Sequence, residues 1–236
     1  MADLRVAIMQ PYLFPYIGYF QLISAVDRFV LYDDVQWIKG GWINRNRIQI
    51  RGEPHYITVP ISSDGHRKPI HQRQLAASYP LAVSKILAQL EDAYRRAPYY
   101  QNVRDLVSDC LNTEGRNVCE LVIRSMKSIC SFLDIQTPLI RSTSLPPISG
   151  CGVHRVVEVV RHLSGLTYIN AIGGRELYAH EDFQRAGLRL QFLLTGDVQY
   201  PQLMGRFIPS LSIIDVLMFN SPQETRELLG KFELVQ

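Results

Sequence analysis

Short apolar runs alternate with helical patterns from the start of the chain, and this alternation constrains the fold more than any other feature. Residues 5–9 and 29–32 are apolar runs typical of buried strands, and residues 17–25 between them predict a helix. Two strands joined through a helix form a βαβ unit, which pairs the strands in parallel. The chain therefore begins with a parallel sheet.

A β-hairpin is predicted after this unit. Residues 45–51 and 55–61 alternate in polarity and flank Gly52-Glu53-Pro54, a turn signal. Because successive side chains of a strand point to opposite faces, Arg45, Arg47 and Arg51 are expected to share one face. One face of the hairpin is therefore basic.

The middle of the chain is helical, and the last third returns to alternation. Apolar residues at three-four spacing predict helices over 83–97 and 118–133, with Thr113 as the N-cap of the second. Later strands are predicted at 139–140, 168–169 and 188–194, and later helices at 153–163, at 209–219 and from Ser221-Pro222 onward. We predict one α/β domain over residues 1–236: a doubly wound, mostly parallel, Rossmann-like sheet with a β-hairpin insertion and a helical segment at 79–133.

Composition excludes several classes of protein. The formal net charge is only +3, with basic and acidic residues interspersed, which argues against neutralising a nucleic-acid backbone as the main task. No run of about 18 apolar residues predicts a membrane span, and the N-terminus lacks the pattern of a signal peptide. We expect a soluble cytoplasmic protein. Its oligomeric state is left open.

Cysteine and histidine spacing predicts no metal site. There is no Cys-x-x-Cys pair and no finger-like His pair among Cys110, Cys119, Cys130 and Cys151. Cys119 and Cys130 lie on one predicted helix, about 16 Å apart along its axis, and cannot bond to each other. We expect reduced core thiols, and we expect His66 and His71 to be solvated.

The loop after the first strand is the first candidate for binding chemistry. Gln10, Tyr12, Tyr16 and Tyr19 supply hydrogen-bonding groups, and Gly18 permits close approach of backbone. The following helix would present free N–H groups to a phosphate or carboxylate. The alternative is an aromatic plug that covers the sheet edge.

Asp33 and Asp34 end the second predicted strand. Paired carboxylates at a strand end can hold Mg²⁺, bind an amine or act as a general base. The alternative is a hydrated turn. We favour a functional role, because Lys39, Arg45 and Arg47 follow closely and could clamp a phosphate or carboxylate.

Two tryptophans and a glycine-containing loop complete the candidates. Trp37 and Trp42 flank Lys39 and could stack on sugar or base rings, although tryptophan is also common in cores. Residues 170–175 follow a predicted strand, and their glycines could turn backbone N–H groups toward a ligand or form a routine turn. Asp215, among apolar neighbours, is expected to pair with an arginine or cap a turn.

Several of these segments resemble the WbqC-like protein family. The resemblance is carried by residues 8–23, 32–37, 42–47, 168–170 with Gly173-Gly174 and Tyr178, and 211–215, and it spans nearly the whole chain. It implies a role in O-antigen or related sugar biosynthesis, with transfer of glycine or another aminoacyl group to an amino sugar.

The first strand, loop and helix of the chain are also similar to the corresponding segment of nucleotidyl-transferring enzymes such as pantothenate synthetase. Tyr16 and Tyr19 stand where those enzymes use histidines on ATP phosphates, so an ATP-cleaving role is disfavoured.

The resulting hypothesis is an acyl- or aminoacyltransferase acting on the amine of an amino sugar or sugar nucleotide. Asp33 or Asp34 would be the base, and Tyr16 with Gln10 would stabilise an oxyanion. The predicted substrate-binding residues are Gln10, Tyr12, Tyr19, Trp37, Lys39, Trp42, Asn44, Arg45, Arg47, Asn170, Gly173, Gly174 and Tyr178. We expect the first loop, the aspartates and the hairpin arginines to converge over one rim of the sheet.

Two alternative functions are an ATP-dependent adenylating amide ligase and a non-catalytic sugar-nucleotide binding partner. The sequence does not identify the cofactor, the acyl donor or the acceptor.

Overall fold

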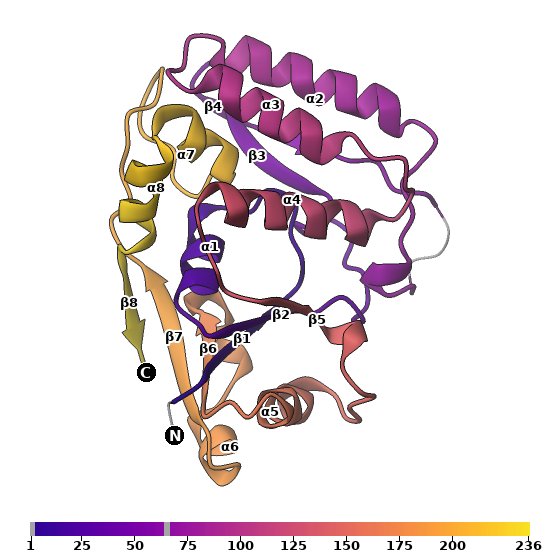
Figure 1. Ribbon diagram of the computed structural model, residues 1–236, viewed down its shortest axis with the longest axis vertical. Coiled ribbons are helices and arrows are strands. Elements are labelled where there is room, and N and C mark those ends of the chain that lie inside the picture. The colour runs from indigo at the N-terminus through magenta and orange to yellow at the C-terminus, as the bar shows by residue number, and fades with distance from the viewer. Residues whose placement is uncertain (1–2, 64–66) are drawn as a thin grey trace.

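A six-stranded sheet organises the computed structural model, which describes residues 3–63 and 67–236 (Figure 1). Its strand order is β5-β2-β1-β6-β7-β8. The first five of these strands are parallel and β8 is antiparallel to β7. Their bounds are β1 Arg5–Met9, β2 Arg28–Leu31, β5 Leu139–Arg141, β6 Thr167–Ala171, β7 Arg189–Thr195 and β8 Phe232–Val235. The predicted α/β class with a mostly parallel sheet is confirmed.

Helices cover both faces of the sheet. On one face α1 (Ile17–Ser24), α4 (Val118–Phe132), α7 (Ile213–Phe219) and α8 (Pro222–Leu229) share a hydrophobic core. On the other face α5 (Gly152–His162) and α6 (His180–Arg185) form a second core. Strand β1 contributes Ala7 to the first core and Val6 and Ile8 to the second, because its side chains alternate between faces. Burial on both faces explains why the strands are continuous apolar runs.

The hairpin and the helical segment lie beside this sheet. Strands β3 (Arg45–Ile50) and β4 (Glu53–Thr58) form a separate antiparallel pair. Helix α2 (Tyr79–Tyr94) packs against both of these strands, and α3 (Tyr100–Leu111) packs against α2 (Figure 1). Short 3-10 helices occupy Ile70–Gln72, Ser142–Ser144 and Ile172–Leu177.

The predicted basic face of the hairpin is smaller than expected. Arg51 was expected on this face, but it lies in the turn with a φ of 53°, and the next residue, Gly52, has a φ of 82°. Only Arg45 and Arg47 therefore share that face.

Other boundaries differ from the sequence patterns. Asn117, and not Thr113, caps α4, because its side chain accepts a hydrogen bond from the backbone N–H of Glu120. Helix α6 and strand β8 were not predicted, because each is short, and α3 lies within the predicted helical segment at 79–133 without having been predicted as a separate helix. Ser221 caps α8 as expected, in a reciprocal capping box.

Buried Asp215 has different partners from those expected. Its carboxylate accepts hydrogen bonds from the hydroxyls of Tyr94, at 2.6 Å, and Tyr200, at 2.7 Å, and from the amide of Gln202. Burial raises the pKa of Asp215, and these donors oppose the rise. No arginine joins the cluster in the part of the chain described. Asp215 therefore links α7 to α2 through neutral donors.

Three of the four cysteines are core residues. Cys110, Cys119 and Cys130 are buried free thiols, whereas Cys151 is exposed and so is not a core residue.

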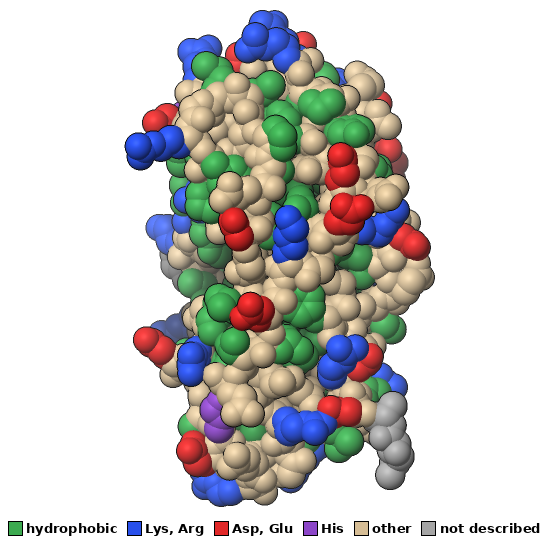
Figure 2. All heavy atoms as spheres, turned by 90° about the vertical axis from the view of Figure 1, so that its left-hand side faces the viewer, with side chains coloured by type: hydrophobic (Ala, Val, Ile, Leu, Met, Phe, Trp, Pro, Cys, Tyr) green, Lys and Arg blue, Asp and Glu red, His purple; other side chains and the backbone are tan. Residues whose placement is uncertain are grey.

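Charged side chains of both signs are interspersed on the face drawn in Figure 2. Over residues 3–63 and 67–236, no helix is long and apolar enough to cross a bilayer, and no group of three or more His, Cys, Asp or Glu could hold a metal ion. His66 lies outside the described residues.

We expect Ser212→Ala to destabilise the protein by about 2 kcal/mol, because the change removes two buried hydrogen bonds. The Ser212 hydroxyl accepts from the N–H of Ile214 as the N-cap of α7 and donates to the carbonyl of Phe14. Urea unfolding would measure the loss. Ser84→Ala is the control, since its exposed hydroxyl bonds only within α2, and it should change stability by less than about 0.5 kcal/mol. Equal unfolding midpoints for the two variants would contradict the expectation.

Candidate functional site

A cleft with a cavity volume of about 820 Å³ opens at the carboxyl ends of β1, β2, β6 and β7. The chain passes from β1 to β2 on one side and returns with β6 on the other, so the strand order reverses beneath the cleft. Doubly wound sheets bind ligands at this switch point. The predicted residues that line the cleft are Gln10, Tyr12, Tyr16, Trp42, Arg47, Asn170, Gly173, Gly174 and Tyr178.

The loop from Gln10 to Tyr16 is held from two directions. It turns at Phe14, whose φ of 41° is in the left-handed region that few non-glycine residues adopt. The hairpin holds it through the Asn46 amide, which donates to the Leu13 carbonyl at 3.0 Å. The start of α7 holds it through the Ser212 hydroxyl, which donates to the Phe14 carbonyl at 2.7 Å. Segments distant in sequence therefore impose the conformation of this loop.

Gly18 allows the phenol of Tyr16 to lie at the base of the cleft. A Cβ atom at Gly18 would come within 2.3 Å of the Tyr16 ring and 2.5 Å of the Thr195 hydroxyl. Burial raises the pKa of Tyr16, against a smaller lowering by its hydrogen bond with Thr195. Tyr16 is therefore a neutral O–H donor at physiological pH.

Tyr19 supports the cleft from below. It is buried, and its hydroxyl donates to the Gln10 carbonyl at 2.7 Å. Its position fixes the backbone of Gln10, and its ring does not line the cleft. Tyr19 was predicted to bind substrate, but in the structure its hydroxyl positions the Gln10 backbone.

Arg47 is the only charged residue among those that line the cleft in the described structure. Its guanidinium lies 5.5 Å from the centre of the Trp42 ring. Its Nε is buried without a hydrogen-bond partner, and it makes no ion pair within the described residues. A partly desolvated and unpaired cation is the natural partner of an anionic ligand group.

The other hairpin candidates are occupied by the fold. Arg45 donates to the carbonyls of Gly40 and Gly41 and lies 4.5 Å from the centre of the Tyr56 ring. Asn44 donates to the Val59 carbonyl at 2.7 Å. Neither lines the cleft.

The loop after β6 forms the opposite side of the cleft. Asn170 is only 5% exposed, and its side-chain carbonyl accepts from the Ala171 N–H at 2.8 Å. A Cβ at Gly174 would lie 2.6 Å from the Asn170 amide nitrogen, whereas a Cβ at Gly173 would meet no atom within 4 Å. Gly174 therefore leaves room for Asn170, and Gly173 faces open space.

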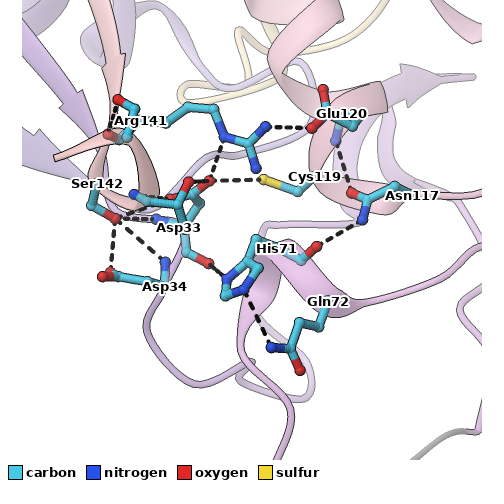
Figure 3. A network of polar contacts seen from close by, with 11 residues as sticks. Asp33, Asp34, His71, Gln72, Asn117, Cys119, Glu120, Arg141 and Ser142 are labelled. Atoms are coloured by element: carbon cyan, nitrogen blue, oxygen red, sulfur yellow. Dashed lines mark hydrogen bonds and ion pairs between the residues drawn. The ribbon is translucent and has the colours of Figure 1, made fainter. Parts of the chain in front are cut away.

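Asp33 is buried in a network of donors shown in Figure 3. It is 0% exposed and accepts from Arg141 Nε at 2.6 Å, from the Ser142 hydroxyl at 3.0 Å and from the Thr143 N–H at 3.0 Å. Burial alone would raise its pKa, but Arg141 and the other donors outweigh burial and hold the pKa below its usual value. A carboxylate so fully paired is a weak base.

Asp34 is also paired, and it faces away from the cleft. It shares the one hydroxyl proton of Ser142 with Asp33, at 2.7 Å from the Ser142 oxygen, and forms an ion pair with Arg155. The Arg155 guanidinium lies 5.1 Å from the centre of the Tyr32 ring. His71, expected to be solvated, contacts the Asp33 carbonyl through Nδ1 at 3.1 Å (Figure 3). Asp34 lines a separate surface hollow with His71 and Arg155. The expected convergence of the aspartates with the first loop is therefore corrected.

Sequence reasoning missed several residues of the cleft. Tyr32, Asn46, Thr195 and Ser210 line it without having been singled out. Tyr32 follows the last residue of β2, and Thr195 is the last residue of β7. Their positions at the ends of parallel strands were the available signal. Trp37 and Lys39 line an adjacent hollow.

A doubly wound sheet with an aromatic cleft at its switch point defines an α/β protein with a candidate ligand-binding site. The model of the WbqC-like protein family matches residues 10–227, so this chain belongs to that family. Among curated proteins, the uncharacterized protein Rv1507c of Mycobacterium tuberculosis is 31% identical over 227 residues, covering 95% of this chain and 97% of that protein. No solved structure matches the chain.

We expect Gly174→Ala to displace the Asn170 side chain and Gly173→Ala to leave it in place. The reason is the 2.6 Å approach of a Cβ at Gly174, against open space at Gly173. The ¹H–¹⁵N resonances of the Asn170 side-chain amide would report the difference. A shift of equal size in both variants would show that Gly174 does not leave room for Asn170.

We expect Asp33→Asn to destabilise the protein by about 3 kcal/mol at neutral pH, the lower end for a broken buried ion pair, because Arg141 keeps its contact with Glu120. The folded pKa of Asp33 is below its usual 3.8. Its contribution is therefore present above pH 3.8 and lost as the pH falls toward the folded value. Urea unfolding between pH 2 and 7 should show this acid loss in the wild type and less of it in the variant. Parallel pH profiles would contradict the assignment.

Proposed function

We propose that the protein is an acyl- or aminoacyltransferase that binds a phosphate-bearing amino sugar, such as a sugar nucleotide, in the cleft. The observation that carries the proposal is Arg47, an unpaired and partly buried cation beside Trp42 in a cleft at the switch point of the sheet. Assembly of bacterial surface polysaccharide is the setting that the family resemblance supports.

The chemistry of the cleft suits a sugar linked to a phosphate. Arg47 offers a forked donor to the phosphate oxygens. Aromatic rings of Trp42, Tyr12 and Tyr178 offer flat apolar faces to a sugar or base ring. Gln10 and Asn170 add neutral hydrogen-bonding groups for hydroxyls. A volume of about 820 Å³ is within the usual range for small-molecule sites.

The electrostatics of the cleft favour a nucleophilic amine without a carboxylate base. Among the described residues that line it there is no Asp or Glu, and the one charge is the Arg47 cation. Desolvation disfavours an ammonium, and this favours the neutral, nucleophilic form of an amine bound here. The roles predicted for Asp33 and Asp34 as base are therefore not carried into the proposal.

The proposed step is aminolysis of an acyl thioester. The amine nitrogen attacks the carbonyl carbon, the C–N bond forms and the C–S bond breaks. The proton lost by the amine passes to the leaving sulfur, so the products are an amide and a free thiol. The Tyr16 hydroxyl and the Asn170 amide are neutral donors that could stabilise the oxyanion.

We expect Arg47→Ala to weaken binding of UDP-N-acetylglucosamine about ten- to hundredfold, because it removes a charge-assisted hydrogen bond. Isothermal titration calorimetry would measure the Kd. Arg51→Ala is the matched control, since Arg51 is 82% exposed on the same hairpin and outside the cleft, and it should bind like the wild type. Equal affinity in the Arg47 and Arg51 variants would remove the anion subsite.

The reaction class has a separate assay. Protein supplied with UDP-glucosamine and a panel of acyl-coenzyme A donors should release free thiol and form an amide. AMP release from ATP and an amino acid would instead identify an adenylating ligase. Binding of the sugar nucleotide without product from any donor would identify a non-catalytic binding partner.

A further inference from the structure

A second hollow adjoins the cleft and shares part of its lining. It has a cavity volume of about 740 Å³ and is lined by Gln10, Val35, Gln36, Trp37, Ile38 and Lys39. Two of these residues, Gln10 and Ile38, also line the cleft. The two cavities are therefore adjacent, and Gln10 and Ile38 lie at their boundary. We call the cleft with Arg47 the first compartment and the hollow with Lys39 the second compartment.

The two compartments have the same sign of charge, although Arg47 is partly buried and Lys39 is exposed. Each is lined by a single basic residue, Arg47 in the first and Lys39 in the second, and by no Asp or Glu among the described residues. Lys39 forms no ion pair within the described chain. Two cations in adjacent cavities suit two anionic groups, one in each cavity.

We propose that the compartments bind two substrates at once, the phosphate-bearing amino sugar in the first and a phosphate-bearing acyl thioester in the second. The inference rests on the proposed function and adds the place and chemical class of the donor. Lys39 binds the phosphate of the donor as a point charge. Ile38, which is 56% exposed, gives the acyl chain or thioester linkage an apolar surface.

Gln10 marks the point where the two substrates meet. It is the one polar residue shared by both compartments, directly after β1. Its backbone is fixed by the hydrogen bond from buried Tyr19 at 2.7 Å. At this boundary the amine of one substrate attacks the thioester carbonyl of the other, with the bond changes and proton transfer given above. The Gln10 amide can donate to the carbonyl oxygen.

The two tryptophans of the chain provide one fluorescence reporter for each compartment. Trp42 lines the first and Trp37 lines the second, and the sequence contains no other tryptophan. A Trp37→Phe protein therefore reports on the first compartment, and a Trp42→Phe protein on the second. UDP is the probe for the first compartment and coenzyme A the probe for the second.

We expect UDP to change the emission of the Trp37→Phe protein and coenzyme A that of the Trp42→Phe protein. Lys39→Ala should raise the Kd of coenzyme A about tenfold and leave that of UDP unchanged, while Arg47→Ala should do the reverse. On wild-type protein, calorimetry should detect coenzyme A binding with similar affinity before and after saturation with UDP. The calorimetric arm does not depend on the folding of any variant.

Two results would overturn the inference in distinguishable ways. Competition between UDP and coenzyme A, or a response of Trp42 to both, would remove the second compartment while leaving the proposed transferase in place. No binding of UDP or UDP-N-acetylglucosamine by the wild type would remove the proposed function together with the compartments.

Discussion

The conformation of the Gln10–Tyr16 loop depends on hydrogen bonds from two segments that are distant in sequence. Asn46 of the hairpin and Ser212 at the start of α7 donate to consecutive carbonyls of the loop, at Leu13 and Phe14. These bonds hold Phe14 at an unusual positive φ. The same contacts bring Arg47 to the loop, because the backbone N–H of Ser212 donates to the Arg47 carbonyl. One set of contacts therefore assembles the sheet edge, the hairpin and the cation around a single cleft.

Two buried acidic residues, Asp33, which was predicted to be catalytic, and Asp215, which was predicted to be structural, both connect distant segments of the fold. Asp33 joins β2 to the segment after β5 through Arg141, Ser142 and Thr143. Asp215 joins α7 to α2 by accepting from the Tyr94 hydroxyl. Buried carboxylates are tolerated only when such donors satisfy them. Because these acids are used in the interior, the described lining of the cleft carries one positive charge and no negative one, and this imbalance favours anionic ligands.

Sequence patterns predicted the elements whose physical signal is local. Strands β1 and β2 with α1 between them follow from apolar runs and their spacing, and the hairpin follows from its turn residues. Ser221 was recognisable as a cap because a capping box needs only neighbouring residues. Strand β8 is short and partly exposed at the sheet edge, and α6 has six residues, so neither produces a periodic signal. Arg51 was misplaced because the turn ended the strand one residue early.

The sequence by itself determined the α/β class and the parallel arrangement of its first strands. These properties follow from periodicity, chain connectivity and residue type, which are local. The tertiary structure alone decided which polar residues face the cleft. Asp33 and Asp34 come directly before Val35, which lines the second compartment, yet both point into ion pairs with arginines more than a hundred residues later. Arg47 forms no ion pair among the described residues. Pairing in a folded interior depends on contacts between distant segments, and sequence spacing does not encode those contacts.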